Sequence, residues 1–213
     1  MSRFLLLLLV LSVGCNNAAP PPPTQYPSSY DYPVVNIQFL DDAVSNGELT
    51  TDFTRLAFTD KDGKPVLLAD YLGKQSLVLV MTRGYSGSIC PYCATQTSRL
   101  IANYPEIRER QAEVLVVYPL ERTSDGVQRE SLIASAVGML PGASKDVPFP
   151  LVLDVELKAV DALGIRGNLS KPATYIFDKH GKVQFAYVGS TISDRPSVKS
   201  ILSQLDRLNK GDG

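Results

Sequence analysis

The sequence has no tryptophan, one histidine and three cysteines among its 213 residues, so it offers few of the usual metal ligands. A catalytic zinc ion takes about three protein ligands and a structural one about four, which this inventory can hardly supply. The 21 basic residues nearly balance the 22 acidic ones and form no long run. Phosphate binding needs clustered cations. We therefore expect no metal, no cofactor and no nucleic-acid partner.

The apolar run at the N-terminus, residues 4–11, is too short to span a membrane, because a spanning helix takes about 20 residues. It follows Arg3 and is typical of the apolar region of a secretory signal peptide. The run ends in Ser12-Val13-Gly14-Cys15, which resembles a bacterial lipobox, where the cysteine is lipidated and becomes the new N-terminus. We predict a signal peptide over residues 1–14 and a lipid on Cys15, with plain secretion as the alternative.

The segment that follows contains four consecutive prolines, residues 20–23. Such runs favour extended polyproline II and offer little apolar surface to bury. We predict that residues 15–48 are a lipid-anchored N-terminus and proline-rich linker, with a loosely ordered end before a single domain at 49–213. A proline-rich ligand for another protein is the alternative. Two or more acyl chains would hold the protein at the cell envelope, facing the periplasm or the exterior.

Strand and helix patterns alternate in residues 49–213 and predict an α/β fold. Three runs, 77–81, 114–118 and 151–153, are apolar throughout, as expected for strands covered on both faces. A turn signal at 60–63 and a hairpin around Asp178-Lys179-His180-Gly181 add further strands. We expect helices from about residue 90, with a kink or restart at Pro105, over 127–137, and over 198–208. These elements predict a three-layer αβα sandwich with a mixed central sheet.

The cysteine pair Cys90-Pro91-Tyr92-Cys93 follows the first apolar strand after a polar loop that contains glycine. If Cys90 caps a helix, residues i and i+3 share one face and the two sulfurs can meet. Pro91 suits the first helical position, and the unpaired N–H groups there favour a Cys90 thiolate. Cys90 would then attack, and Cys93 would resolve the mixed disulfide. Half of a zinc site and a purely structural disulfide are the alternatives, but the second pair of ligands is missing and so small a loop constrains the unfolded chain little.

Further stretches of the domain have counterparts in one known family. They are Asp52–Leu56, Asp62-Gly63-Lys64, Asp70–Lys74, Lys171–Lys182, Tyr187-Val188-Gly189 and Asp194-Arg195-Pro196-Ser197. With the cysteine pair, they resemble the peroxiredoxin-like AhpC/TSA family (alkyl hydroperoxide reductase/thiol-specific antioxidant) of the thioredoxin-fold superfamily. The resemblance implies a thioredoxin-like sandwich and a thiol-dependent oxidoreductase.

The resemblance also implies residues that position a substrate. Thioredoxin-fold oxidoreductases have a cis-proline opposite the cysteine pair, and Pro172 fits that place. The backbone of Lys171 would then pair with an incoming chain. Between the cysteines, Pro91 and Tyr92 are also candidates for positioning a substrate, with plain packing as the alternative for Tyr92. An ordinary proline at the start of a strand is the alternative for Pro172.

Other residues would support the thiolate or the transition state. Peroxiredoxins have a threonine three residues before the reactive cysteine, where this chain has Gly87, so Ser86 or Ser88 would have to replace it. Arg166 is the candidate for a transition-state arginine, with a surface cation as the alternative. Arg83 is a candidate for lowering the pKa of the thiol.

Two enzymatic functions agree with these observations. The leading one is an extracytoplasmic, membrane-tethered thiol–disulfide oxidoreductase that uses the dithiol on protein or small-molecule disulfides. The alternative is a thiol peroxidase with Cys90 peroxidatic and Cys93 resolving, whose partners are peroxides and reducing thiols. Lower-ranked alternatives are a copper-handling lipoprotein, which would have a wider cysteine spacing and a distal histidine, and a non-catalytic binding module.

Overall fold

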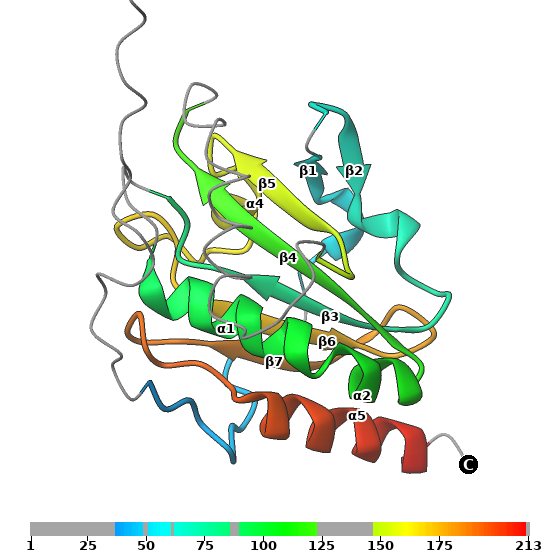
Figure 1. The fold of residues 1–213 in the computed structure, drawn as a ribbon. Helices are drawn as coiled ribbons and strands as arrows, with labels where there is room; N and C mark the ends of the chain where they lie inside the picture. The colour runs from blue at the N-terminus through cyan, green and yellow to red at the C-terminus, as the bar shows by residue number, and fades with distance from the viewer. Residues whose placement is uncertain (1–36, 49–50, 61, 86–89, 123–146, 212–213) are drawn as a thin grey trace, which may run out of the picture.

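A seven-stranded mixed sheet in the order β2-β1-β5-β4-β3-β6-β7 lies at the centre of the fold (Figure 1). The structure is a computed structural model that describes residues 37–48, 51–60, 62–85, 90–122 and 147–211. The strands are Ala57–Thr59 (β1), Pro65–Leu67 (β2), Ser76–Met81 (β3), Ala112–Leu120 (β4), Leu151–Val155 (β5), Ala173–Phe177 (β6) and Val183–Val188 (β7). The predicted α/β sandwich with a mixed sheet is thereby confirmed.

The three apolar runs predicted as buried strands lie side by side as β3, β4 and β5. They are parallel, with Val78 paired to Val114 and Tyr118 paired to Leu153. β6 runs antiparallel to β3 on its other side. Every residue of β3 and β6 is buried, which explains why these segments show no alternation of polar and apolar residues.

Helices cover both faces of this sheet. On one face lie α1 (Pro91–Ala102), α2 (Tyr104–Glu109) and α5 (Val198–Gly211), with α4 (Lys158–Ala162) behind it (Figure 1). Val78 and Val80 pack into the apolar cluster that contains Leu100 of α1, whereas Leu77 and Leu79 pack into the cluster with α4. Alternate residues of β3 therefore face the two helical layers.

Several local predictions are confirmed. α2 restarts with Pro105 as its second residue, directly after α1 ends. The predicted hairpin joins β6 to β7, and Asp178 Oδ1 accepts the backbone N–H groups of His180 and Lys182, both at 2.9 Å. Short 3-10 turns at Phe53–Arg55 and Leu68–Asp70 flank the β1–β2 hairpin. The helix predicted over 127–137 lies outside the described residues.

The segment 37–48 packs on the domain, ahead of the boundary predicted at residue 49. The Leu40 N–H donates to the Arg195 carbonyl at 2.8 Å, and the Ser197 N–H donates to the Leu40 carbonyl at 2.8 Å. Further along, the Asn46 side chain accepts the N–H of Val188 at 2.8 Å and so covers the edge strand β7. The segment thus occupies a sheet edge that would otherwise expose unpaired backbone groups.

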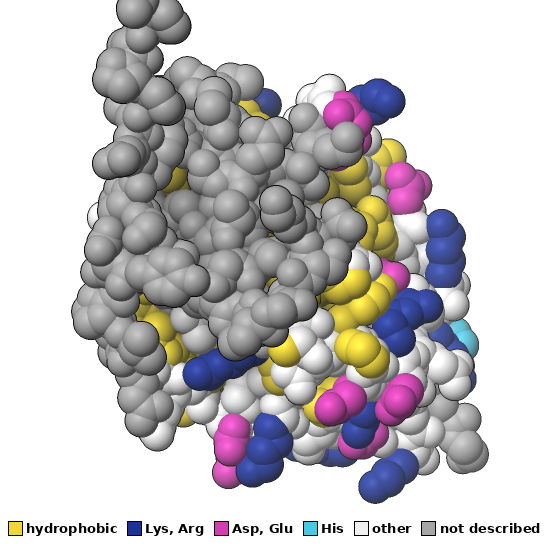
Figure 2. Space-filling model, in the orientation of Figure 1, with side chains coloured by type: hydrophobic (Ala, Val, Ile, Leu, Met, Phe, Trp, Pro, Cys, Tyr) yellow, Lys and Arg dark blue, Asp and Glu magenta, His cyan; other side chains and the backbone are white. Residues whose placement is uncertain are grey.

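The described surface over α2 and α5 carries charges of both signs. Figure 2 shows acidic and basic side chains interspersed at the lower right of the view, where Figure 1 places these helices. Arg110 and Asp206 form one such pair across the two helices at 2.8 Å. None of the helices in the described ranges combines the length and the apolar character needed to cross a bilayer.

Candidate active site

The two cysteines lie together at the start of α1, on the helical face of the sheet that also bears α2 and α5. Cys90 immediately precedes the helix and Pro91 is its first residue, as predicted. The N–H groups of Cys93 and Ala94 donate to the Cys90 carbonyl at 3.0 and 3.1 Å. Both cysteines are free thiols, and a hydrogen bond joins the two sulfurs. Cys90 is 6% exposed and Cys93 is completely buried.

Gly84 shapes the loop between β3 and this helix. Its φ is +97°, which side chains rarely allow, and a Cβ there would lie 2.5 Å from the Pro119 carbonyl oxygen. The next residue, Tyr85, donates its N–H to that same carbonyl at 3.0 Å. The loop therefore follows the end of β4 closely before it reaches the cysteines.

A buried arginine, Arg195, lies against the inner sulfur. Its side chain is 1% exposed, and Nη2 donates to Cys93 Sγ at 3.3 Å. Nη1 donates to Gln96 Oε1 at 2.6 Å, and Nε donates to the Ile192 carbonyl at 2.9 Å. In the described part of the chain, none of these partners is a carboxylate. Because a buried charge is costly unless it is paired, the guanidinium is placed to pair with a thiolate.

The charge in this site favours a thiolate at Cys93, whereas the sequence predicted it at Cys90. Burial alone would raise the pKa of Cys93, but the hydrogen bond from Cys90 and the Arg195 guanidinium outweigh it and lower the pKa to about 5. That same bond to Cys93, and then burial, raise the pKa of Cys90. The prediction of a Cys90 thiolate is therefore wrong for this geometry, because the cation lies beside the second sulfur.

Polar side chains complete the surroundings of the sulfurs. The Thr97 hydroxyl donates to the Cys93 carbonyl at 3.0 Å and lies 2.9 Å from the Tyr118 hydroxyl. Burial, followed by the nearby Cys93 charge, raises the pKa of Tyr118, which keeps that phenol protonated. The only cationic side chain among these neighbours in the described ranges is that of Arg195.

Thr82, the residue directly after β3, has a fully buried hydroxyl that finds no hydrogen-bond partner within the described part of the chain. Strand alternation puts its side chain on the same face as Val78 and Val80, the face that carries α1. The backbone of the next residue, Arg83, hydrogen-bonds Cys93 and helps to lower its pKa. The unsatisfied Thr82 hydroxyl is therefore one residue away in sequence from the backbone group that hydrogen-bonds the Cys93 sulfur.

The prediction of a cis peptide bond at Pro172 is wrong, and the backbone groups of Lys171 are paired within the fold. No peptide bond in the described ranges is cis, and these include the bond before Pro172. The Lys171 N–H donates to the Ile165 carbonyl at 2.8 Å, and its own carbonyl accepts the Ser170 hydroxyl at 2.8 Å. Pro172 accepts the N–H of Gly189 at 2.8 Å and leads into β6. These backbone groups already have partners inside the fold, so Pro172 is the ordinary strand-entry proline.

The remaining residues that the sequence predicted for the site lie in different parts of the structure. Arg166 lies at the surface and binds Asp161 at 2.7 Å, so it is the surface cation and no transition-state residue. Arg83 reaches Cys93 through its backbone. Tyr92 is half-buried and packs against the core. Ser86, Ser88 and Cys15 lie outside the described residues.

Sequence reasoning missed Arg195, Gln96 and Thr82. The stretch Asp194-Arg195-Pro196-Ser197 contributed to the family resemblance, but nothing in it indicated a contact with a cysteine 102 residues earlier. The spacing of Gln96, three residues after Cys93, could have placed both on one helical face.

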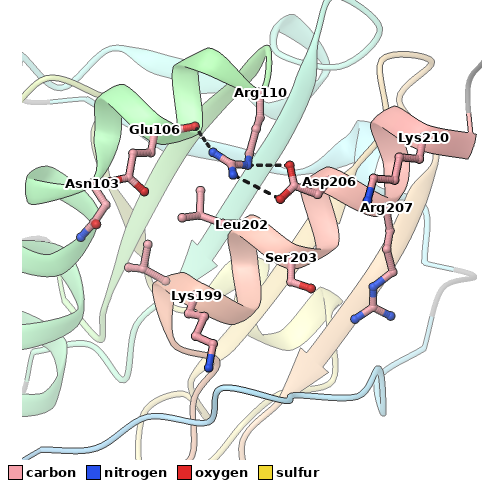
Figure 3. A pocket seen from close by; sticks show the side chains of 10 residues that line it. Asn103, Glu106, Arg110, Lys199, Leu202, Ser203, Asp206, Arg207 and Lys210 are labelled. Carbon is pink, nitrogen blue, oxygen red and sulfur yellow. Dashed lines mark hydrogen bonds and ion pairs between the residues drawn. The ribbon is translucent and has the colours of Figure 1, made fainter.

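A groove of about 580 Å³ between α2 and α5 does not contain the cysteines (Figure 3). It begins at Asn103, beyond the far end of α1, and twelve helical residues separate it from Cys90, a rise of about 18 Å. Inside it, Arg110 is already bound to Asp206 and to the Glu106 carbonyl. The groove is therefore separate from the thiol site.

The sequence model of the AhpC/TSA family matches residues 47–186, about two thirds of the chain. The chain belongs to the AhpC/TSA family. The family match begins within the packed segment 37–48 and ends before Arg195 and α5, so it assigns nothing to that arginine. Membership confirms the predicted resemblance and the prediction of a thiol-dependent oxidoreductase.

Solved structures of peroxiredoxins share the fold of this chain. Peroxiredoxin Q of Xanthomonas campestris is 19% identical, with a TM-score of 0.54, over 76% of this chain and 97% of the other. Peroxiredoxin 6 of Arenicola marina is 16% identical, with a TM-score of 0.62, over 80% and 76%. A yeast mitochondrial 1-Cys peroxiredoxin is 16% identical, with a TM-score of 0.63, over 78% of each chain. No curated protein matches this chain.

Proposed function

We propose that this protein is a thiol peroxidase that reduces hydroperoxides with the Cys90–Cys93 dithiol. One observation carries the proposal: in an AhpC/TSA domain, two hydrogen-bonded thiols lie beside a buried guanidinium at a helix start, with only a small part of Cys90 exposed. The perturbed pKa values of these sulfurs are typical of a functional site.

The accessibility of the sulfurs supports a small oxidant over a protein disulfide. Exchange with a protein disulfide needs a sulfur that another chain can approach, whereas Cys90 is 6% exposed and Cys93 is fully buried. The backbone of Lys171, expected to pair with an incoming chain, already has partners within the fold. A peroxide group consists of two bonded oxygens and can reach a sulfur through a far narrower opening.

The chemistry requires no cofactor. The Cys90 sulfur bonds the terminal peroxide oxygen, the O–O bond breaks, and an alcohol or water leaves with a proton. Cys90 is then a sulfenic acid. Cys93 attacks its sulfur, a disulfide forms and hydroxide leaves as water. An external thiol, either small or on a protein, restores the dithiol by exchange.

We also propose that the enzyme acts at the cell envelope, anchored through lipid on Cys15 after removal of residues 1–14. The apolar run and the lipobox-like sequence support this location. Residues 16–36 could reach about 70 Å when fully extended, enough to hold the domain clear of a membrane surface. Incorporation of labelled palmitate that disappears in Cys15→Ser tests the anchor, and equal labelling of both proteins would exclude it.

Single-turnover oxidation by hydrogen peroxide tests the proposed reaction. We expect the reduced protein to lose two thiols per peroxide, at a rate well above that of free cysteine. Cys90→Ser should lose the fast reaction, and Cys93→Ser should stop at a sulfenic acid that a dimedone probe captures.

Reduction of a protein disulfide by the same preparations is the matched comparison. A peroxide rate no faster than that of free cysteine, together with rapid reduction of the protein disulfide, would falsify the peroxidase and establish disulfide exchange.

A further inference from the structure

The reduced site requires one negative charge. Arg195 is buried, and its side chain donates to a neutral amide oxygen, a neutral carbonyl and a sulfur. A buried cation without an anion is strongly unfavourable. Within the described part of the chain, the two sulfurs are the groups in this cluster that can supply the anion.

The geometry distinguishes the two sulfurs. Cys93 Sγ is 3.3 Å from Arg195 Nη2 and also accepts hydrogen bonds from the Cys90 thiol and the Arg83 backbone. The other titratable group that faces it is the Tyr118 phenol on β4, which remains protonated. Three donors therefore converge on Cys93, and hydrogen bonds to a charged form stabilise that form.

Solvent exposure identifies the other sulfur, that of Cys90, as the one that meets the oxidant. Cys93 has no contact with solvent, whereas Cys90 has a small exposed area. The sulfur that holds the charge is therefore shielded from the oxidant, and the sulfur that can meet the oxidant holds a proton. The hydrogen bond between them gives that proton a direct path.

We propose, building on the peroxidase function above, that Arg195 fixes the negative charge of the reduced dithiol on Cys93, and that this thiolate is the internal base that takes the proton from Cys90. Arg195 acts through Cys93 and is a positioning residue. The role differs from that of an arginine that touches the attacking sulfur, and residue 195 lies outside the family match.

The proposed reaction transfers one proton between the two sulfurs and two electrons to the peroxide. The Cys90 proton moves to Cys93 as the Cys90 sulfur bonds the terminal peroxide oxygen and the O–O bond breaks. The leaving alkoxide or hydroxide takes that proton from Cys93. The restored Cys93 thiolate attacks the Cys90 sulfenic sulfur and expels hydroxide, which solvent protonates. The two sulfurs give up two electrons in total, and the peroxide gains them.

The direct test is an NMR titration of the reduced protein with isotope-labelled cysteine Cβ, in a Cys15→Ser background, with single Cys90→Ser and Cys93→Ser variants for assignment. We expect the Cys93 signal to titrate well below the range of free cysteine and the Cys90 signal to stay constant through neutral pH. A Cys90 signal that titrates first in the unsubstituted site would overturn the proposal without reference to any Arg195 variant.

Arg195 variants test the origin of the charge. Arg195→Gln should weaken the acid dissociation of Cys93 by about ten- to hundredfold, the usual effect of a lost hydrogen bond to a charged group. Arg195→Lys should restore part of it. Arg166→Gln, which removes a surface arginine bound to Asp161, is the matched control and should change nothing. Equal midpoints of the Cys93 titration in the Arg195→Gln and Arg166→Gln proteins would overturn the role of Arg195.

Alkylation of Cys90 by iodoacetamide tests the role of Cys93 as a base. In the unsubstituted protein, the rate should rise with the titration of Cys93, and in Cys93→Ser it should rise with the pKa of Cys90 itself. Identical profiles would exclude Cys93 as the base. Neither measurement uses peroxide, so a failure of the proposed peroxidase would not be confused with a failure of this inference.

Discussion

At the scale of the residue, the unpartnered hydroxyl of Thr82 lowers the stability of the fold beside the active site. It is fully buried directly after β3, and the Arg83 backbone that follows it hydrogen-bonds Cys93. A buried hydroxyl without a partner costs roughly 1–3 kcal/mol, so removing this hydroxyl should not destabilise the fold.

We expect Thr82→Val to leave the rate of peroxide oxidation of the dithiol unchanged, because the fully buried hydroxyl cannot meet the oxidant. The free energy of unfolding should stay the same or rise by about 1 kcal/mol, because an unsatisfied group is removed. Stopped-flow oxidation and urea unfolding measure the two effects. Thr82→Ser keeps the hydroxyl and is the control. A clear loss of stability in Thr82→Val would instead indicate that the hydroxyl has a structural role.

Arg166 and Arg195 show, by comparison with the cysteine pair, which site residues the sequence could not predict. Cys90 and Cys93 were predictable because three residues along one helix fix their separation. Arg166 was chosen for its place before the last strands, yet it lies beside Asp161 at the surface. Arg195 reaches Cys93 across 102 residues, and only the folded loop before α5 brings them together. Local spacing cannot encode a contact of that range.

At the scale of the element, the segment 37–48 holds the loop that carries Arg195. The backbone of Leu40 pairs with Arg195 on one side and with Ser197 on the other, each at 2.8 Å. The segment also adds Asn46 and Gly47 to the edge of the sheet at Ala186. A sequence pattern could not predict this packing, because most of these contacts are hydrogen bonds and the segment has no periodic pattern of apolar residues. The buried strands were predictable for the opposite reason, since burial on both faces leaves an unbroken apolar run.

We therefore expect a chain that begins at residue 49 to differ from one that begins at residue 37. Loss of four backbone hydrogen bonds to Leu40, Asn46 and Gly47 should lower the free energy of unfolding by about 4 kcal/mol. The pKa of Cys93 should rise toward that of free cysteine, because Arg195 loses its support. Chemical unfolding and thiolate absorbance measure both quantities.

Asp41→Ala in the chain that begins at residue 37 is the control for a merely surface effect. Its contacts with Ser197 and Lys199 are exposed, and such pairs contribute about 0–1 kcal/mol. The Cys93 pKa should not change in this variant. If the chain that begins at residue 49 also kept the lowered pKa, the segment would cover the sheet edge without positioning Arg195.

At the scale of the whole molecule, the charged site makes stability depend on pH and on oxidation together. The pKa of Cys93 is lowered to about 5 in the folded protein, against about 8.5 in an unfolded chain. Between these values the unfolded state holds one more proton, so the free energy of unfolding rises with pH by at most about 1.4 kcal/mol per unit. Below pH 5 this contribution is absent, because Cys93 is protonated in both states.

Above about pH 8.5 the slope of the free energy of unfolding against pH changes sign. The pKa of Cys90 is raised in the folded protein, so the folded state keeps a proton that the unfolded state loses, and stability falls as pH rises. The reduced protein should therefore be most stable near the pKa of a free thiol. The disulfide form has no thiolate and should lack this maximum, while its short loop adds little stability of its own.

Urea unfolding of reduced and oxidised protein at matched pH isolates the effect, because the carboxylates contribute equally to both and cancel in the difference. We expect that difference to grow from pH 5 toward pH 8 and then to decline. In Arg195→Gln the rise should be shorter, since Cys93 ionises later there. A difference that stayed level across this range would mean that folding does not hold a thiolate, and that the guanidinium has some other buried anion as its partner.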